Sequence, residues 1–187
     1  TMVEDALMEN PLQAWSAGDN TIAWISKMTN ELKVFHHGEI IVLASLVNDI
    51  PFTAGLDMVA YRDPSDLGLK AYYNGEVFDV DPFMPERIQM GRGLFAYIDK
   101  SGALKVLQGG KIHTALDFTP DEFFVKDSLV VINDKSYCKI FHNGSTMTIT
   151  PYWPKRWAAR WSTFVWLDND NSLQRWTTAG TKELLQR

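Results

Sequence analysis

If this chain performs chemistry, its histidines are the first residues to consider. They are His36, His37, His113 and His142. Histidine is a common metal ligand and general base. Adjacent residues of a strand, however, point to opposite faces of the sheet, so His36 and His37 are not expected to face one ligand. We interpret the histidines as turn or surface residues and predict no metal site.

The carboxylates suggest two further kinds of chemistry. The segment LDNDNS, residues 167–172, is similar to a calcium loop, but it lacks the glycine at the sixth position and the terminal bidentate glutamate. A carboxylate pair could instead hydrolyse a glycoside. No serine-nucleophile elbow, phosphate loop or dinucleotide fingerprint occurs. We therefore predict no catalytic residue and no cofactor.

An irregular run of aromatic and basic side chains is the best candidate for a binding site. It reads PYWPKRWAARW, residues 151–161. The candidate ligand-binding residues are Trp153, Arg156, Arg160 and Trp161. An exposed patch of this kind suits sugar stacking or a protein hot spot. The alternative is that Trp153 and Trp161 only thicken the last sheet or cap the fold.

Those candidates stand out against an internal repeat. Five aligned segments, TIAWIS, MVAYRD, LFAYID, LVVIND and TFVWLD, place a large residue at Trp24, Tyr61, Tyr97, Ile132 and Trp166, with spacings of 37, 36, 35 and 34 residues. Nine residues before each stands another large apolar residue, at Trp15, Phe52, Ile88, Phe123 and Trp157. The alternation of apolar and polar residues in each unit predicts strands. The unit is therefore four short strands in about 35 residues.

Turn residues support this interpretation. The dipeptides Asn74-Gly75 and Asn143-Gly144 favour tight hairpins in which both central residues have positive φ. His37-Gly38, Gly109-Gly110 and Ala179-Gly180 occupy the same column. An earlier turn carries Asp63, Asp99, Asp134 and Asp168, with Ser26 in the first repeat. We expect these carboxylates to accept backbone N–H bonds and close the loop, which argues against a catalytic pair.

Four-stranded units at this period predict an all-β fold, namely a β-propeller of five short four-stranded blades. Part of a larger propeller, or an open arc that closes by dimerisation, is the alternative. We predict a single domain, residues 1–187. Its repeats are at about 11–49, 50–84, 85–119, 120–153 and 154–187. A leftover strand at 2–10 precedes them and could pair with a second molecule to form a homodimer.

Composition and charge indicate which classes of partner are not expected. The net charge of −5 gives no long-range attraction for phosphates, so nucleic acid is not an expected partner. No apolar run reaches the roughly 20 residues that a membrane-spanning helix needs, so we expect no membrane insertion. The single cysteine, Cys138, allows no internal disulfide.

A family resemblance becomes visible at the level of the repeat. Units such as LFAYIDKSGALKVLQGGKIHTAL, residues 94–116, resemble the short propeller-like repeats of multidomain proteins of the Bacteroidetes type. The resemblance covers nearly the whole chain and implies a fold rather than an activity. Because such repeats occur mostly on exported proteins, it also implies an extracytoplasmic location, periplasmic or secreted.

Three functions follow as hypotheses. The first is a non-enzymatic binding or scaffolding module that recognises a protein or a carbohydrate through one face. The second is a small glycan-active enzyme with carboxylates at the propeller axis. The third is a structural spacer within a longer protein.

Overall fold

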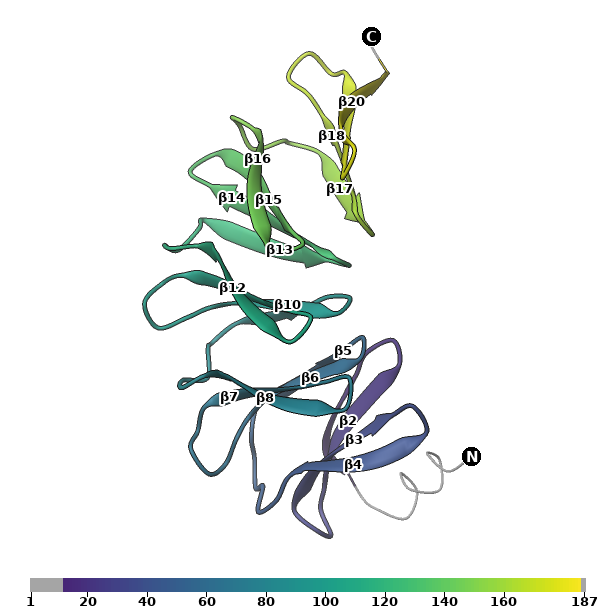
Figure 1. Cartoon of the computed structure of the whole chain (residues 1–187), viewed down its shortest axis with the longest axis vertical. Helices are drawn as coiled ribbons and strands as arrows, with labels where there is room; N and C mark the ends of the chain where they lie inside the picture. The colour runs from purple at the N-terminus through teal and green to yellow at the C-terminus, as the bar shows by residue number, and fades with distance from the viewer. Residues whose placement is uncertain (1–11, 186–187) are drawn as a thin grey trace. The chain divides into compact units, whose positions relative to one another are not determined.

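The protein is built from strands and turns. The computed structural model describes residues 12–185, and within this range there is no helix, and hence none that could cross a bilayer. Twenty strands in this described range form five antiparallel sheets of four strands each (Figure 1). The all-β prediction and the four-stranded repeat are confirmed. The chain divides into two compact units, residues 1–86 and residues 87–187.

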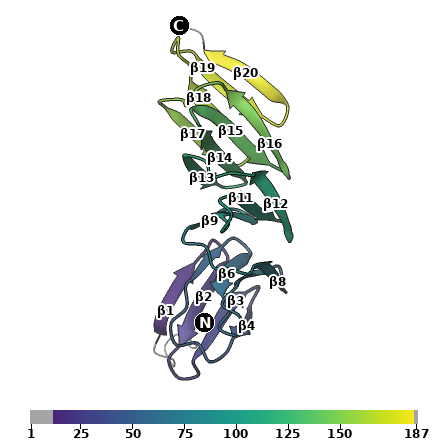
Figure 2. The same cartoon turned by 90° about the vertical axis from the view of Figure 1, so that its left-hand side faces the viewer.

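Each sheet is a meander in which strands follow one another in chain order, as β13 to β16 show in Figure 2. The first unit contains β1 (Leu12–Ala17), β2 (Thr21–Ser26), β3 (Glu31–His36), β4 (Glu39–Ala44), β5 (Phe52–Gly55), β6 (Met58–Arg62), β7 (Leu69–Tyr73) and β8 (Glu76–Asp81). The second unit contains β9 (Ile88–Met90), β10 (Leu94–Ile98), β11 (Leu104–Gln108), β12 (Lys111–Leu116), β13 (Glu122–Lys126), β14 (Leu129–Asp134), β15 (Tyr137–His142), β16 (Ser145–Thr150), β17 (Trp157–Arg160), β18 (Thr163–Leu167), β19 (Leu173–Thr177) and β20 (Gly180–Leu185).

The two columns of large residues in the sequence are cross-strand partners. In every sheet the column residue of the first strand lies directly opposite that of the second. The pairs are Trp15 with Trp24, Phe52 with Tyr61, Ile88 with Tyr97, Phe123 with Ile132 and Trp157 with Trp166. Directly opposed large side chains are the pairs that stabilise antiparallel strands. The register of all five sheets is therefore the same.

The third turn of each sheet is the tight hairpin that the sequence predicts, with one exception. Both central residues have positive φ in four sheets, at His37-Gly38, Asn74-Gly75, Gly109-Gly110 and Asn143-Gly144. In the fifth sheet Thr177 pairs with Gly180. The central residues of that turn are therefore Thr178 and Ala179, so the alignment of Ala179-Gly180 with the other dipeptides was one residue off.

The second turn of each sheet is closed by its own acidic or hydroxyl side chain. Asp99 Oδ1 accepts the N–H groups of Ser101 and Ala103, each at 2.9 Å. Asp63 Oδ1 accepts the Ser65 N–H at 2.7 Å. Asp168 accepts the Asn169 N–H, and Ser26 Oγ accepts the Thr29 N–H at 3.4 Å. Asp134 differs, because its carboxylate pairs with the Lys139 ammonium group. The recurring aspartates are turn residues, as expected.

The core of the first unit lies between its two sheets. Ala23, Ile25 and Val34 of the first sheet are fully buried and belong to apolar clusters with Val59 and Tyr61 of the second. The sheets approach closely at Gly18, where an added Cβ would lie 2.0 Å from the carbonyl oxygen of Gly55. Only glycine fits at this contact.

The second unit buries its three sheets in the same way. Ala96 and Leu104 of one sheet belong to a cluster with Val130 and Ile132 of the next. Leu129, Val131, Cys138 and Ile140 belong to a cluster with Phe164, Trp166 and Trp176 of the last sheet. Burial raises the pKa of the Cys138 thiol to about 12, so this cysteine is an inert core residue.

Some sequence predictions are left as predictions. The leftover strand at 2–10, and the homodimer through it, lie outside the described residues. Each described sheet falls inside one of the five predicted repeats. The single-domain assignment, the larger-propeller alternative and the arc closed by dimerisation stay predictions.

Candidate functional site

The first and third turns of a four-stranded meander lie at the same end of the sheet, because successive strands run in opposite directions. We call this end the paired-turn edge. It carries two clusters of contacts between neighbouring sheets, one in each unit. In both, a residue of a first turn is held in the left-handed backbone region, Asp57 with φ 58° and Trp161 with φ 56°.

Trp161 lies in the β17–β18 turn, and residues of the neighbouring sheet hold its backbone. Its N–H donates to Asp127 Oδ2 at 2.9 Å, and its carbonyl accepts a hydrogen bond from Ser128 Oγ at 2.8 Å. The Asp127 carbonyl in turn accepts the Arg92 N–H at 2.7 Å. The first turns of three successive sheets are thereby joined through Asp127.

The Trp161 side chain takes no part in these backbone hydrogen bonds. The indole is 52% exposed. The guanidinium carbon of Arg92 lies 4.4 Å from its ring centroid, which is a cation–π contact. Arg160, the last residue of β17, is exposed beside it. We call Trp161, Arg92 and Arg160 the Trp161 surface.

The other two predicted site residues lie elsewhere. Trp153 precedes β17 and is partly buried, stacked on Phe124 at 6.2 Å and edge-on to Trp157 at 5.7 Å between ring centroids. It packs in the core between two sheets. Because Trp153 and Trp161 lie beyond opposite ends of β17, the structure does not bring the four predicted residues into one patch.

Arg156 lies at a cavity of about 580 Å³ at the opposite edge of the last sheet. The cavity is lined by Lys155, Arg156, Leu167, Asp168, Asn169, Asn171, Leu173 and Leu185. Asp168 accepts hydrogen bonds from Tyr152 and Asn169, and Asp170 Oδ1 accepts the Ser172 N–H at 2.8 Å. These carboxylates close their own turn, and the arrangement does not favour a calcium loop.

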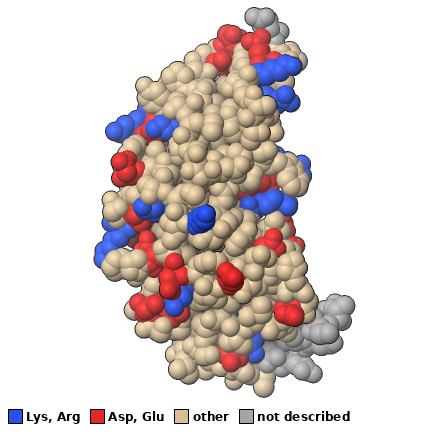
Figure 3. Space-filling model, viewed as in Figure 1, with Lys and Arg blue, Asp and Glu red and all other residues tan. Residues whose placement is uncertain are grey.

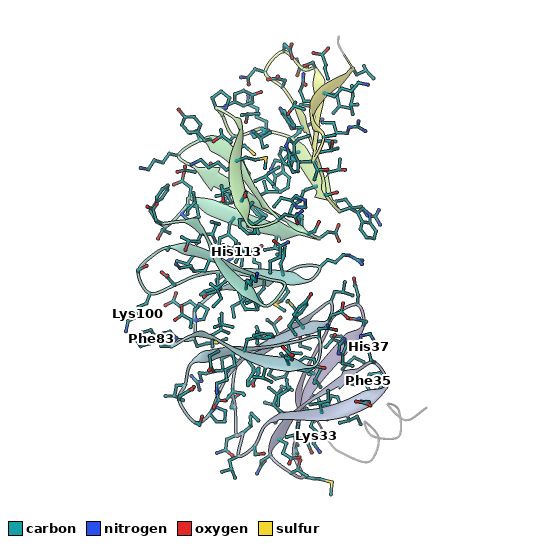
Figure 4. The ribbon with its side chains drawn as sticks, in the orientation of Figure 1. Lys33, Phe35, His37, Phe83, Lys100 and His113 are labelled. Carbon is teal, nitrogen blue, oxygen red and sulfur yellow. The ribbon has the colours of Figure 1, made fainter. Side chains whose placement is uncertain are left out.

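In the first unit the paired-turn edge carries His36, His37 and Asp57. The expectation that the two histidines face apart is wrong. His36 Nε2 lies 3.0 Å from Asp57 Oδ1, and His37 Nε2 lies 3.8 Å from the same oxygen. The reason is that strand alternation ends at His36, because His37 already belongs to the turn and has φ 51°. Figure 4 shows His37 at this turn, on the hairpin that carries Lys33 and Phe35.

Further polar contacts fix this histidine cluster. His36 is 3% exposed, and its Nδ1 lies 2.9 Å from the Tyr72 hydroxyl. The Asp57 N–H donates to Asn20 Oδ1 at 2.8 Å, and the Asn20 amide donates to the Asp57 carboxylate. Burial raises the pKa of Asp57, but the hydrogen bonds from His36 and Asn20 outweigh it, so the pKa lies below its ordinary value.

This arrangement is unsuited to nucleophilic catalysis. Asp57, His36 and Tyr72 form a carboxylate–imidazole–hydroxyl chain, which in an enzyme would activate the hydroxyl. Tyr72 is only 1% exposed, and burial raises the pKa of its hydroxyl. A substrate therefore has no access to the oxygen that the chain would activate.

Two features of the site were missed from the sequence. Arg92 occupies the first-turn position that holds Asp19, Leu56, Asp127 and Trp161 in the other repeats, so a basic residue there was a detectable signal. No such signal marked Asp57 in the sequence, because the residues that it contacts, His36 and Asn20, belong to the preceding repeat. Charges on the face in Figure 3 are interspersed, with acidic and basic groups side by side.

Comparison with known proteins gives a family and several structural likenesses. The model of a family described as 10-bladed beta propeller domain matches residues 1–185. No curated protein sequence matches the chain.

Similar solved structures include the CRINKLY WD40 ectodomain of the Arabidopsis thaliana receptor kinase ACR4, with TM-score 0.49, 10% identity, and coverage of 95% of this chain and 68% of that one. The computationally designed Ika8 protein has TM-score 0.44, 14% identity, and coverage of 94% and 61%. Prp20p from Saccharomyces cerevisiae has TM-score 0.46, 7% identity, and coverage of 87% and 56%. The chain thus spans less than two thirds of the length of Ika8 and of Prp20p.

Proposed function

The chain belongs to the family of the 10-bladed beta propeller domain, and from that premise we propose that it is a non-enzymatic module that binds a protein partner through the Trp161 surface. One observation carries this proposal. A half-exposed tryptophan stands in a left-handed turn where backbone geometry favours a small residue.

The energetics of the turn argue that stability alone would not select tryptophan. A non-glycine residue in the left-handed region costs roughly 1–2 kcal/mol, and aspartate, asparagine and glycine tolerate it best. The equivalent turns follow that rule, with Asp57, Gly93 and Asp127 at positive φ. Bulky residues held in unfavourable backbone regions cluster at functional sites.

The contacts of Trp161 favour a protein over a sugar. Sugar stacking needs an open indole face, and Arg92 already occupies one of the two faces of the ring. Tryptophan and arginine are among the residues most enriched at protein–protein hot spots, where a few residues provide most of the binding energy. Arg160 adds a second cation to the same surface.

The non-enzymatic part of the proposal rests on where the carboxylates lie. The first strands of the five sheets, β1, β5, β9, β13 and β17, carry only one carboxylate, Glu122. A glycosidase pair needs two carboxyl groups about 5–10 Å apart. The recurrent aspartates are instead engaged in closing the second turns.

The test is selection of binding peptides from a phage-displayed random library on the wild-type protein. Selected peptides are then measured against Trp161→Asn, which keeps a residue that tolerates the left-handed turn. The matched control is Tyr137→Asn, because Tyr137 is a 47% exposed aromatic residue outside the paired-turn edge. We expect Trp161→Asn to weaken binding at least about tenfold and Tyr137→Asn to leave it unchanged.

Four outcomes would contradict the proposal. Peptides that bind both variants equally would place the binding surface elsewhere. A glycan array signal that Trp161→Asn abolishes would make the ligand a carbohydrate. Turnover of a chromogenic glycoside that is lost on replacing Glu122 would make the protein an enzyme. Absence of any selected peptide would favour the structural spacer.

A further inference from the structure

The histidine cluster on the first unit is separate from the Trp161 surface and is not used by the proposed function. We propose that His36, His37 and Asp57 form a binding site for a divalent transition-metal ion of the class that prefers imidazole and carboxylate ligands, with Zn²⁺ as the probe. The site would hold three protein ligands and leave a fourth position open to solvent.

The ligand atoms already lie at suitable separations. One ring nitrogen of His36, one of His37 and a carboxylate oxygen of Asp57 all lie within 4.8 Å of one another. The two nitrogen–oxygen distances are 3.0 and 3.8 Å. In a tetrahedral zinc site with bonds of about 2.0–2.1 Å, neighbouring ligand atoms are about 3.3 Å apart. Small side-chain rotations therefore suffice to receive the ion.

Two of the three ligands are held in place by further contacts. The Tyr72 hydroxyl at 2.9 Å from His36 Nδ1 orients the imidazole with Nε2 toward Asp57. Hydrogen bonds in both directions with Asn20 fix the backbone and the carboxylate of Asp57. Metal-ligating histidines commonly have such a partner on the second ring nitrogen, and it strengthens metal binding.

The site is open on one side. His37 is 69% exposed and Asp57 is 31% exposed, whereas His36 is 3% exposed. An ion can thus enter from solvent and meet a buried ligand at the base of the site. A water molecule, or a side chain of a partner, can complete the coordination.

The repeat provides an independent argument. The columns of His36 and His37 contain Tyr73 and Asn74, Gln108 and Gly109, His142 and Asn143, and Thr177 and Thr178 in the other sheets. The first sheet thus has two adjacent imidazoles where the other four have one or none. A departure of this kind from a column that otherwise serves turn geometry is where function is expected.

The experiment is calorimetric titration of tag-free protein with Zn²⁺ in a buffer that does not chelate zinc. Two variants remove one ligand each, His37→Asn and Asp57→Asn; asparagine tolerates both left-handed backbone positions. The control is His142→Asn, which removes the histidine at the same column of the fourth sheet. We expect one ion per chain, at least tenfold weaker binding in both ligand variants, and a change below twofold in the control.

A second measurement detects Zn²⁺ binding even where the heat of binding is small. Because a ligand that binds the folded state stabilises it, Zn²⁺ should raise the melting temperature of the wild type and of His142→Asn by similar amounts, and that of His37→Asn by less. Absence of any saturable Zn²⁺ binding would overturn the proposal. Binding that His37→Asn and Asp57→Asn leave unchanged would also overturn it. Neither result bears on the Trp161 surface, so the two proposals fail separately.

Discussion

Asp57 and Trp161 occupy equivalent first turns, one in each unit, and have nearly the same backbone, with φ 58° and 56°. At Asp57 the side chain itself holds the turn, through His36 and Asn20 of the neighbouring sheet. At Trp161 the neighbouring Asp127 and Ser128 hold the backbone, and the side chain takes no part in holding the turn. Where the neighbour supplies the hydrogen bonds, the turn residue is free to serve binding.

The largest predicted effect concerns the glycines that bring neighbouring first turns together. An added Cβ at Gly18 would lie 2.0 Å from the Gly55 carbonyl oxygen, and one at Gly91 would lie 2.3 Å from the Asp127 carbonyl oxygen. Because backbone must move, we expect Gly18→Ala and Gly91→Ala each to lower the free energy of unfolding by about 3 kcal/mol in urea titrations.

Gly38→Ala is the control for the conformational cost alone. Gly38 has φ +86° and no atom within 4 Å of an added Cβ, so we expect a loss of about 1 kcal/mol. Equal losses of unfolding free energy at Gly18, Gly91 and Gly38 would mean that the close approach of the sheets adds nothing to the cost of an added Cβ.

The next largest predicted effect distinguishes the turn at Asp57 from the turn at Trp161. Asp57→Gly keeps a residue suited to the left-handed turn but removes the carboxylate that binds His36 and Asn20. Hydrogen bonds to charged groups contribute about 1.5–3 kcal/mol, so we expect a loss of about 2 kcal/mol in the free energy of unfolding. A loss below about 0.5 kcal/mol in urea titration would show that the side chain does not hold this turn.

A smaller effect tests the second turns, which are alike in both units. Burial raises the pKa of Asp99, but hydrogen bonds from Ser101 and Ala103 outweigh it, so the pKa lies below its ordinary value. A carboxyl whose pKa is lowered by folding stabilises the protein above its unfolded pKa of about 3.9, and this contribution is lost as pH falls through the folded pKa.

Asp99→Asn should therefore lower the free energy of unfolding by about 1–2 kcal/mol at pH 7. The difference from wild type should shrink as the pH falls from about 5 to 2, as followed by urea titration at each pH. A difference that is constant over this range would contradict the role of the ionised carboxylate. Asp63 should behave in the same way, because Ser65 makes the equivalent contact.

The repeat made most of the fold predictable. Nine-residue spacing between columns such as Trp157 and Trp166 reflects a two-strand hairpin, and the structure places these residues directly opposite each other. The turns were readable because asparagine and glycine tolerate positive φ and aspartate accepts backbone N–H groups. These are local effects within one repeat.

The site was less predictable because it depends on contacts between repeats. Trp161 was identified because other repeats have Asp19 or Asp127 at the same position, and it is exposed at a turn. Trp153 likewise replaces residues such as Met84 and Thr119, but it packs on Phe124 of the preceding sheet. The pairing of His36 and His37 with Asp57 was missed because strand alternation was applied across a turn. Alternation holds only while the backbone is extended.

The smallest predicted effect is the most direct test of the central claim, which is that Trp161 is retained for binding and not for stability. In Trp161→Asn, relief of the left-handed backbone offsets the loss of the contact with Arg92, so urea unfolding should give a free energy within about 1 kcal/mol of wild type. A loss of more than about 2 kcal/mol would contradict the claim and make Trp161 a structural cap of the last sheet.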